Sequence, residues 1–143
     1  MFALAAGVTS VRDMGNVNER LLELEECFES GELAGPTITR SGLIEGRSEF
    51  SWDLGMIPET LDEAVDLVHW YADRGYHQIK IYNSLNPEWV PRLAEEAHKL
   101  GLRVVGHVPA FTTPDKMIEA GYDEITHVNQ ASASIRRFSC TKR

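Results

Sequence analysis

Lys80 is the residue whose position in the sequence most needs a chemical explanation. It shares one face of a predicted strand with Tyr82, whereas Ile79 and Ile81 lie on the other face, because side chains alternate along a strand. If the isoleucines face covering helices, Lys80 faces the inner side of the sheet, where a lysine is costly unless it is paired or neutral. Two simpler explanations stay open. Lys80 lies in water on an edge strand, or it pairs with a carboxylate such as Asp13.

Two histidines follow at similar points of later strand–helix units. His107 and His127 are 20 residues apart, and Lys80 precedes His107 by 27 residues. Neighbouring parallel strands lie ~4.8 Å apart, so polar side chains at equal heights on successive strands converge. Two neutral imidazoles placed in this way could bind a metal ion such as zinc. Each histidine taken alone is equally typical of a hydrogen-bonded core residue, and both interpretations stay open.

The elements that must position these side chains alternate between strand and helix. Short runs rich in β-branched and apolar residues predict five strands, at 8–13, 37–41, 77–82, 102–108 and 123–128. Strict alternation with helices indicates a parallel sheet with right-handed crossovers. In such folds, functional side chains gather at the carboxyl ends of the strands. Residues 42–58, with three glycines and Trp52, predict a long loop that could close over a ligand.

Helix boundaries are predicted from capping residues and glycine stops. Asn18 is expected to cap a helix over 19–30, and Thr60 begins a capping box before a helix that stops at Gly75. Asn86 opens the next helix, and Thr113 caps a short one.

Composition narrows the class of protein. The 143 residues suit one core, and are far fewer than the ~250 of a complete (β/α)8 barrel. A net charge of -8 argues against nucleic-acid binding, and no stretch approaches the ~20 apolar residues that span a bilayer. Cys27 and Cys140 form no recognisable disulfide framework, which suits a reducing compartment, so we expect a cytoplasmic protein without membrane contact.

The last residues differ from the rest in composition. Residues 131–143 hold four basic residues and no acidic one, after an acidic body. We therefore divide the chain into a folded domain at 1–130 and a basic, Ser-rich tail at 131–143 that is disordered or foreign to the fold.

Five segments in the same order carry a family resemblance. GVTSVRDMGN, GPTITRSG, IKIY, EEAHKLGLRVVGHV and EAGYDEITHVNQ resemble the amidohydrolase superfamily, in its imidazolonepropionase-like and prolidase-like branch. The resemblance implies an α/β fold, a partial (β/α)8 barrel of about five parallel strands. It also implies a metal-dependent hydrolase of C–N bonds (amide, peptide or cyclic amide) that acts through a metal-activated hydroxide on a small-molecule or dipeptide-like substrate.

The resemblance also assigns roles to residues. Lys80 corresponds to a lysine that becomes carboxylated and bridges two metals, and His107 and His127 correspond to metal-binding histidines of the next two strands. The cofactor is therefore one or two divalent metal ions, with zinc expected. Tyr82 could contact the substrate. Arg12 and Asp13 either support the metal ligands from behind or form a structural ion pair.

Part of the family pattern is absent from these 143 residues. The family's first strand supplies a His-x-His pair and its last strand an aspartate, and this sequence contains no His-x-His. We therefore expect a central fragment, strands two to six, that is inactive by itself and can self-associate through exposed sheet edges. Two other readings stay open, a catalytically inactive α/β fragment and a small flavodoxin-like binding module.

Overall fold

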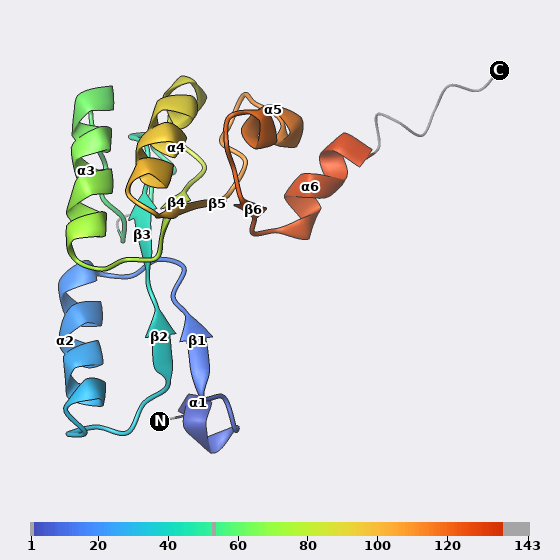
Figure 1. The fold of residues 1–143 in the computed structure, drawn as a ribbon. Helices are drawn as coiled ribbons and strands as arrows, with labels where there is room; N and C mark the ends of the chain where they lie inside the picture. Colours follow the sequence, from blue (N-terminus) through green and yellow to red (C-terminus); the bar gives the residue numbers. More distant parts are fainter. Residues whose placement is uncertain (1, 53, 136–143) are drawn as a thin grey trace.

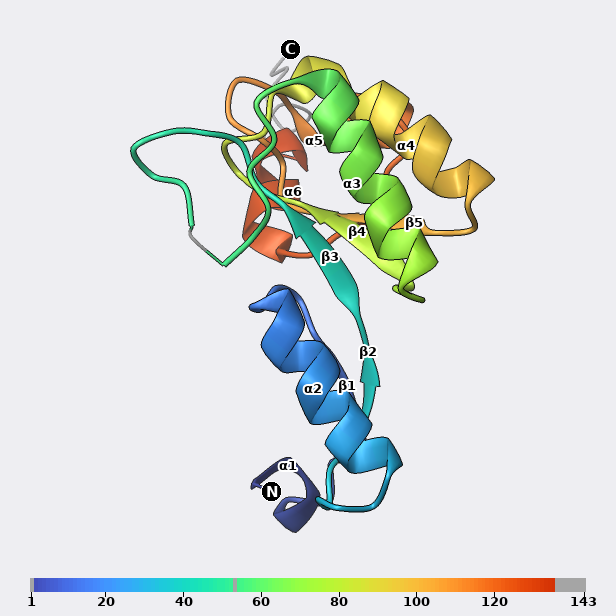
Figure 2. The ribbon, with the colours of Figure 1, turned by 90° about the vertical axis from the view of Figure 1, so that its left-hand side faces the viewer.

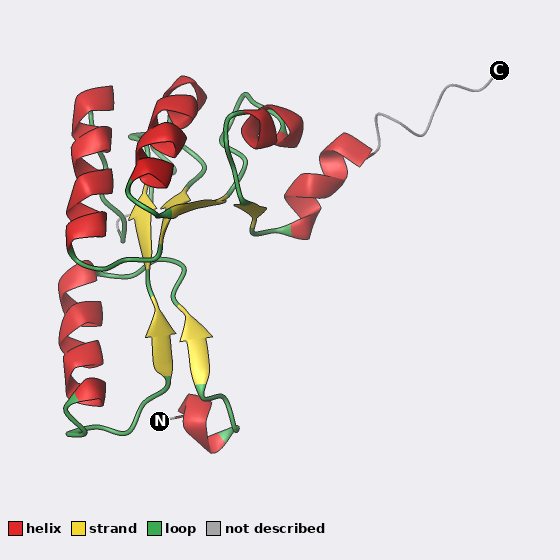
Figure 3. Ribbon diagram, in the orientation of Figure 1, coloured by secondary structure: helices red, strands yellow, loops and turns green. Residues whose placement is uncertain are grey.

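The chain builds parallel strands that are joined by helices, as the alternating sequence pattern predicts. The computed structural model describes residues 2–52 and 54–135. Figures 1 and 3 show β1 and β2 in one half of the molecule and the remaining strands in the other. The strands are β1 (Ser10–Arg12), β2 (Thr37–Thr39), β3 (Ser41–Ile44), β4 (Gln78–Ile81), β5 (Arg103–Gly106) and β6 (Glu124–Ile125). The helices are α1 (Phe2–Ala5), α2 (Asn18–Glu29), α3 (Leu61–Asp73), α4 (Val90–Lys99), α5 (Pro114–Glu119) and α6 (Val128–Ile135), with a 3-10 turn at Pro87–Trp89.

Strand order follows chain order throughout. β1 pairs in parallel with β2, and β3, β4, β5 and β6 form a second parallel sheet in that sequence. β2 and β3 are separated by Arg40 alone, so together they fill the place of one barrel strand, paired first with β1 and then with β4. A flavodoxin-like sheet has the order 2-1-3-4-5. The sequential order excludes that module and is that of a partial (β/α)8-type barrel.

Helices α3 and α4 cover one face of the β3–β4–β5 sheet (Figure 2). Ala64, Val68 and Tyr71 recur at helical spacing on α3 and are fully buried. They belong to one core with Ile79 and Ile81 of β4, as the alternation in that strand predicted. Burying an isoleucine side chain stabilises a fold by about 1.5–3 kcal/mol. Burial of Ile79 and Ile81 therefore determines which face of β4 packs against the helices.

Some predicted boundaries are confirmed. Thr60 accepts a hydrogen bond from the Glu63 N–H at 3.2 Å and caps α3. Thr113 caps α5, and Asn86 caps the 3-10 turn that leads into α4.

Two predictions in the first half of the chain are wrong. The expected loop begins later, because residues 42–44 continue as β3, where Leu43 and Ile44 pair with β4 and are buried. Asn18 is not a cap: it is the first residue of α2, and its buried Oδ1 accepts a hydrogen bond from the Tyr76 hydroxyl at 2.9 Å. A long-range contact therefore outweighs local capping there.

The carboxyl-terminal segment is described only in part. Helix α6 reaches Ile135 and so enters the segment expected to be a tail, and residues 136–143 lie outside the described residues. The division at residue 130 stays a prediction. Over the described part of the chain, no helix is both long and apolar enough to cross a bilayer.

Candidate metal centre

Lys80 lies on the inner face of β4, level with Leu43 of β3 and Val105 of β5. It is only 5% exposed. Burial lowers the pKa of its ammonium, the Asp13 carboxylate opposes that shift, and the Arg12 guanidinium adds to it. The edge-strand explanation is wrong, because β4 lies between two strands. Among the described residues, Asp13 acts on Lys80 through its charge and not through an ion pair.

His107 follows β5 directly, and its two ring nitrogens have different surroundings. Its Nδ1 lies 2.8 Å from the Asn83 Oδ1. An amide oxygen can only accept, so this contact places the imidazole proton on Nδ1 and leaves a lone pair on Nε2. That Nε2 is buried and has no hydrogen-bond partner among the described residues. Burial, with smaller effects from Lys80 and His127, lowers the pKa of His107 to about 4, so the ring is neutral at pH 7.

Aromatic rings connect the inner-face residues. The His107 ring lies 4.5 Å from the ring of His127, edge to face, and 4.2 Å from the ring of Tyr82. The Lys80 Nζ lies 5.3 Å from the Tyr82 ring centre, and Trp52 lies on the loop after β3 with its ring 5.7 Å from Tyr82. Lys80 on β4 and the residues that follow β4, β5 and β6, namely Tyr82, His107 and His127, thus gather at one end of the sheet.

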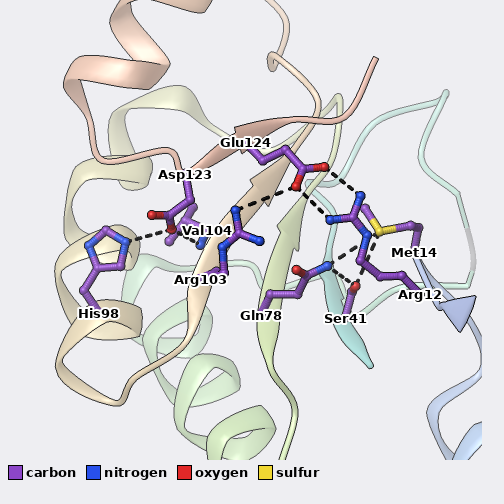
Figure 4. A network of polar contacts seen from close by, with 9 residues as sticks. All are labelled: Arg12, Met14, Ser41, Gln78, His98, Arg103, Val104, Asp123 and Glu124. Atoms are coloured by element: carbon purple, nitrogen blue, oxygen red, sulfur yellow. Dashed lines mark hydrogen bonds and ion pairs between the residues drawn. The ribbon is translucent and has the colours of Figure 1, made fainter. Parts of the chain in front are cut away.

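Arg12 and Asp13 take separate partners, so the ion pair considered between them is not formed. Both guanidinium Nη atoms of Arg12 donate to the Glu124 carboxylate at 2.7 Å, which ties the end of β1 to β6 (Figure 4). Asp13 accepts from the Gly15 N–H at 3.3 Å, and its pKa is raised chiefly by burial. Nothing in the sequence signals the ion pair between Arg12 and Glu124, because the two residues are 112 positions apart.

Residues that hold the histidine in place were missed from the sequence. Asn83 orients the His107 ring, and the buried Tyr122 hydroxyl donates to the His107 carbonyl at 2.8 Å. Asn83 comes directly after Tyr82 at a strand end, so the rule that singled out Tyr82 could have found it. Tyr122 carried no such signal, because its partner is a backbone atom.

Comparison with known proteins shows which known folds this chain resembles. No family model and no curated protein matches the chain. A Bifidobacterium longum protein assigned as a prolidase is similar at 25% identity and a TM-score of 0.66, over 83% of this chain and 32% of its own. Bottromycin amidohydrolase is similar at 21% identity and a TM-score of 0.73, over 86% of this chain and 27% of its own. The chain has an amidohydrolase-like fold.

A third similar structure has no described activity. It is an uncharacterised protein with 20% identity and a TM-score of 0.66, matched over 86% of this chain and 37% of its own. The amidohydrolase-like chain therefore spans between 27% and 37% of the length of these proteins.

The chemistry of the donors fits a divalent metal of the kind amidohydrolase-like folds imply. His107 offers a buried, unpartnered Nε2 lone pair with the opposite nitrogen fixed, which is how a metal-binding histidine is usually held. His127 lies beside it. Among the described residues, no group of three or more His, Cys, Asp or Glu side chains is placed to hold a metal ion. Lys80 lies on the same inner face and is a further candidate ligand only in a form other than an ammonium, which has no lone pair.

We expect His107 to make the metal-free protein less stable in acid. The unfolded imidazole binds a proton below pH ~6.5 and the folded one only near its pKa of about 4, so the free energy of unfolding falls as pH drops through that window. The loss is at most about 3 kcal/mol. Urea unfolding in EDTA at pH 7 and 4.5 measures it, with His107→Gln as the comparison that lacks the titrating imidazole. An equal loss in both proteins would contradict the prediction.

Proposed function

We propose that Lys80, His107 and His127 provide part of a divalent-metal site, with zinc as the metal, in a hydrolase of C–N bonds. The observation that supports this best is the buried, unpartnered Nε2 of His107, with its ring fixed by Asn83 and placed against His127. The amidohydrolase-like fold supports the reaction class. The substrate is proposed to be a small molecule with an amide, peptide or cyclic amide bond, such as a dipeptide.

Lys80 would take part after a covalent change. A neutral amine attacks carbon dioxide: the N–C bond forms as one C–O π bond breaks, and the amine proton passes to solvent water. The product is a carbamate, whose oxygens could bind one or two metal ions. The lowered pKa of buried Lys80 favours the neutral amine that this step needs.

The remaining residues would position the reactants. A bound divalent metal lowers the pKa of water and polarises a carbonyl. Asn83 keeps the His107 lone pair directed inward, and Tyr82, next to both Lys80 and His107, contacts the substrate. The charges of Arg12 and Asp13 act on Lys80 in opposite senses. The ion pair of Arg12 with Glu124 holds the sheet end together, which is a supporting role.

The proposed function is tested with the purified chain, zinc and a panel of dipeptides. We expect zinc to bind and hydrolysis by this chain alone to stay undetectable, because the sequence has no His-x-His pair to complete the family's ligand set. Turnover with stoichiometric zinc would overturn the expectation of inactivity. Failure to bind zinc would overturn the metal site and favour a non-enzymatic α/β fragment. Self-association through exposed sheet edges stays a prediction.

A further inference from the structure

Glu45 is a buried acidic residue that the proposed chemistry does not use. It follows β3 directly and is 0% exposed. Its Oε1 accepts hydrogen bonds from the Gly46 N–H at 2.9 Å and the Ser84 N–H at 2.8 Å, and its Oε2 accepts from the Trp52 N–H at 3.4 Å. A buried carboxylate is costly, and here backbone donors offset the cost. An apolar side chain would fill this place without that penalty, so the three contacts call for an explanation.

The contacts of Glu45 join two loops that come very close. A Cβ atom on Gly46 would lie 1.9 Å from the Ser84 carbonyl oxygen, so only glycine fits there. The Ser48 and Ser84 hydroxyls are 2.8 Å apart. The loop after β3 is therefore fixed against the loop after β4 at several points, and Glu45 contributes the buried side chain among them.

Both joined loops carry residues of the candidate site. The loop after β3 brings Trp52 to the Tyr82 ring. The loop after β4 includes Asn83, the neighbour of Ser84 and the hydrogen-bond partner of His107. Glu45 thus accepts a hydrogen bond from the Trp52 backbone and another from the backbone of Ser84, the residue that follows Asn83.

We propose that Glu45 is a positioning residue, which holds Trp52 over Tyr82 and fixes Asn83 so that the His107 lone pair points into the candidate site. Its importance for hydrolysis rests on the proposed function, whereas its effect on the two side chains does not. Glu45 touches neither substrate nor metal in this proposal.

The two oxygens of Glu45 allow the two effects to be separated. In Glu45→Gln the amide oxygen can keep accepting from Gly46 and Ser84, and its NH2 group then faces the Trp52 N–H, donor against donor. In Glu45→Leu all three contacts are lost. Glu59→Gln is the matched control, since it makes the same chemical change at an exposed carboxylate of the same loop.

Two spectroscopic signals report on positioning without any metal. In the full chain labelled with 5-fluorotryptophan, 19F NMR follows Trp52, assigned with Trp52→Phe, and long-range 1H–15N NMR reports which His107 nitrogen carries the proton. We expect Glu45→Gln to shift the Trp52 signal alone and Glu45→Leu to change both. Glu45→Leu should also weaken zinc binding about tenfold. Glu59→Gln should change neither signal.

An unchanged Trp52 signal in Glu45→Gln would overturn the proposal, and this variant decides the matter even if Glu45→Leu does not fold. An unchanged His107 protonation pattern in a folded Glu45→Leu protein would overturn the link through Asn83. If the wild type binds no zinc while the signals shift as expected, the role of Glu45 in positioning the two side chains is supported and the proposed metal site is wrong.

Discussion

Zinc binding should weaken at least about 100-fold, or about 3 kcal/mol, when His107 is replaced by alanine. His107 contributes the one imidazole whose lone pair is buried and unpartnered among the described residues, so its removal takes away a ligand that is already oriented. Isothermal titration calorimetry with zinc chloride measures the change. His77→Ala is the control, because His77 is an exposed histidine directly before β4, three residues ahead of Lys80. Equal zinc affinity in His107→Ala and the wild type would show that the site lies elsewhere.

Lys80 extends this test to the third proposed ligand. Lys80→Arg keeps a cation on the inner face, but a guanidinium stays protonated and cannot form the carbamate. We therefore expect Lys80→Arg to lower zinc affinity as much as Lys80→Ala does. Affinity retained by the arginine variant would contradict a role for the lysine as a ligand.

Gly42→Ala should destabilise the fold by about 3 kcal/mol, the upper part of the range for overpacking a core. A Cβ atom at residue 42 would lie 2.3 Å from the Tyr71 ring. That ring cannot move away easily, because it is fully buried, its hydroxyl donates to the Leu43 carbonyl at 2.9 Å, and the Tyr76 ring lies 4.8 Å away. Urea unfolding at pH 7 measures the loss.

Gly101→Ala is the matched control for that change. Gly101 has a φ of 77° and open space around the site of a Cβ atom, so its replacement adds backbone strain of about 1–2 kcal/mol and no steric overlap. If Gly42→Ala costs no more than Gly101→Ala, the close packing of β3 against α3 is not what stabilises this sheet.

Local patterns were enough to predict most of the framework. The alternation around Lys80 correctly predicted that Ile79 faces the helices, because burial of one strand face leaves a two-residue period. The hydroxyls of Thr60 and Thr113 were identified as caps because a cap bonds only to N–H groups of the next turn. Sequential strands were implied by the alternation of strand and helix.

Contacts between distant segments could not be predicted in the same way. The sequence predicted that Asn18 caps a helix, but its hydrogen-bond partner is Tyr76, which follows α3 in the sequence. Arg12 pairs with Glu124 and not with its neighbour Asp13. Glu45 looked like one polar residue in a long loop, and nothing in its local sequence signals the backbone donors that surround it.

Zinc content after dialysis tests the proposed metal centre most directly. The wild-type chain is dialysed against zinc, freed of excess ion, and its bound metal is measured by mass spectrometry next to the His107→Ala and Lys80→Ala proteins. We predict at least one zinc ion per wild-type chain and little in either variant. Wild-type protein without zinc, or variants that hold as much as the wild type, would contradict the assignment of Lys80, His107 and His127 as metal ligands.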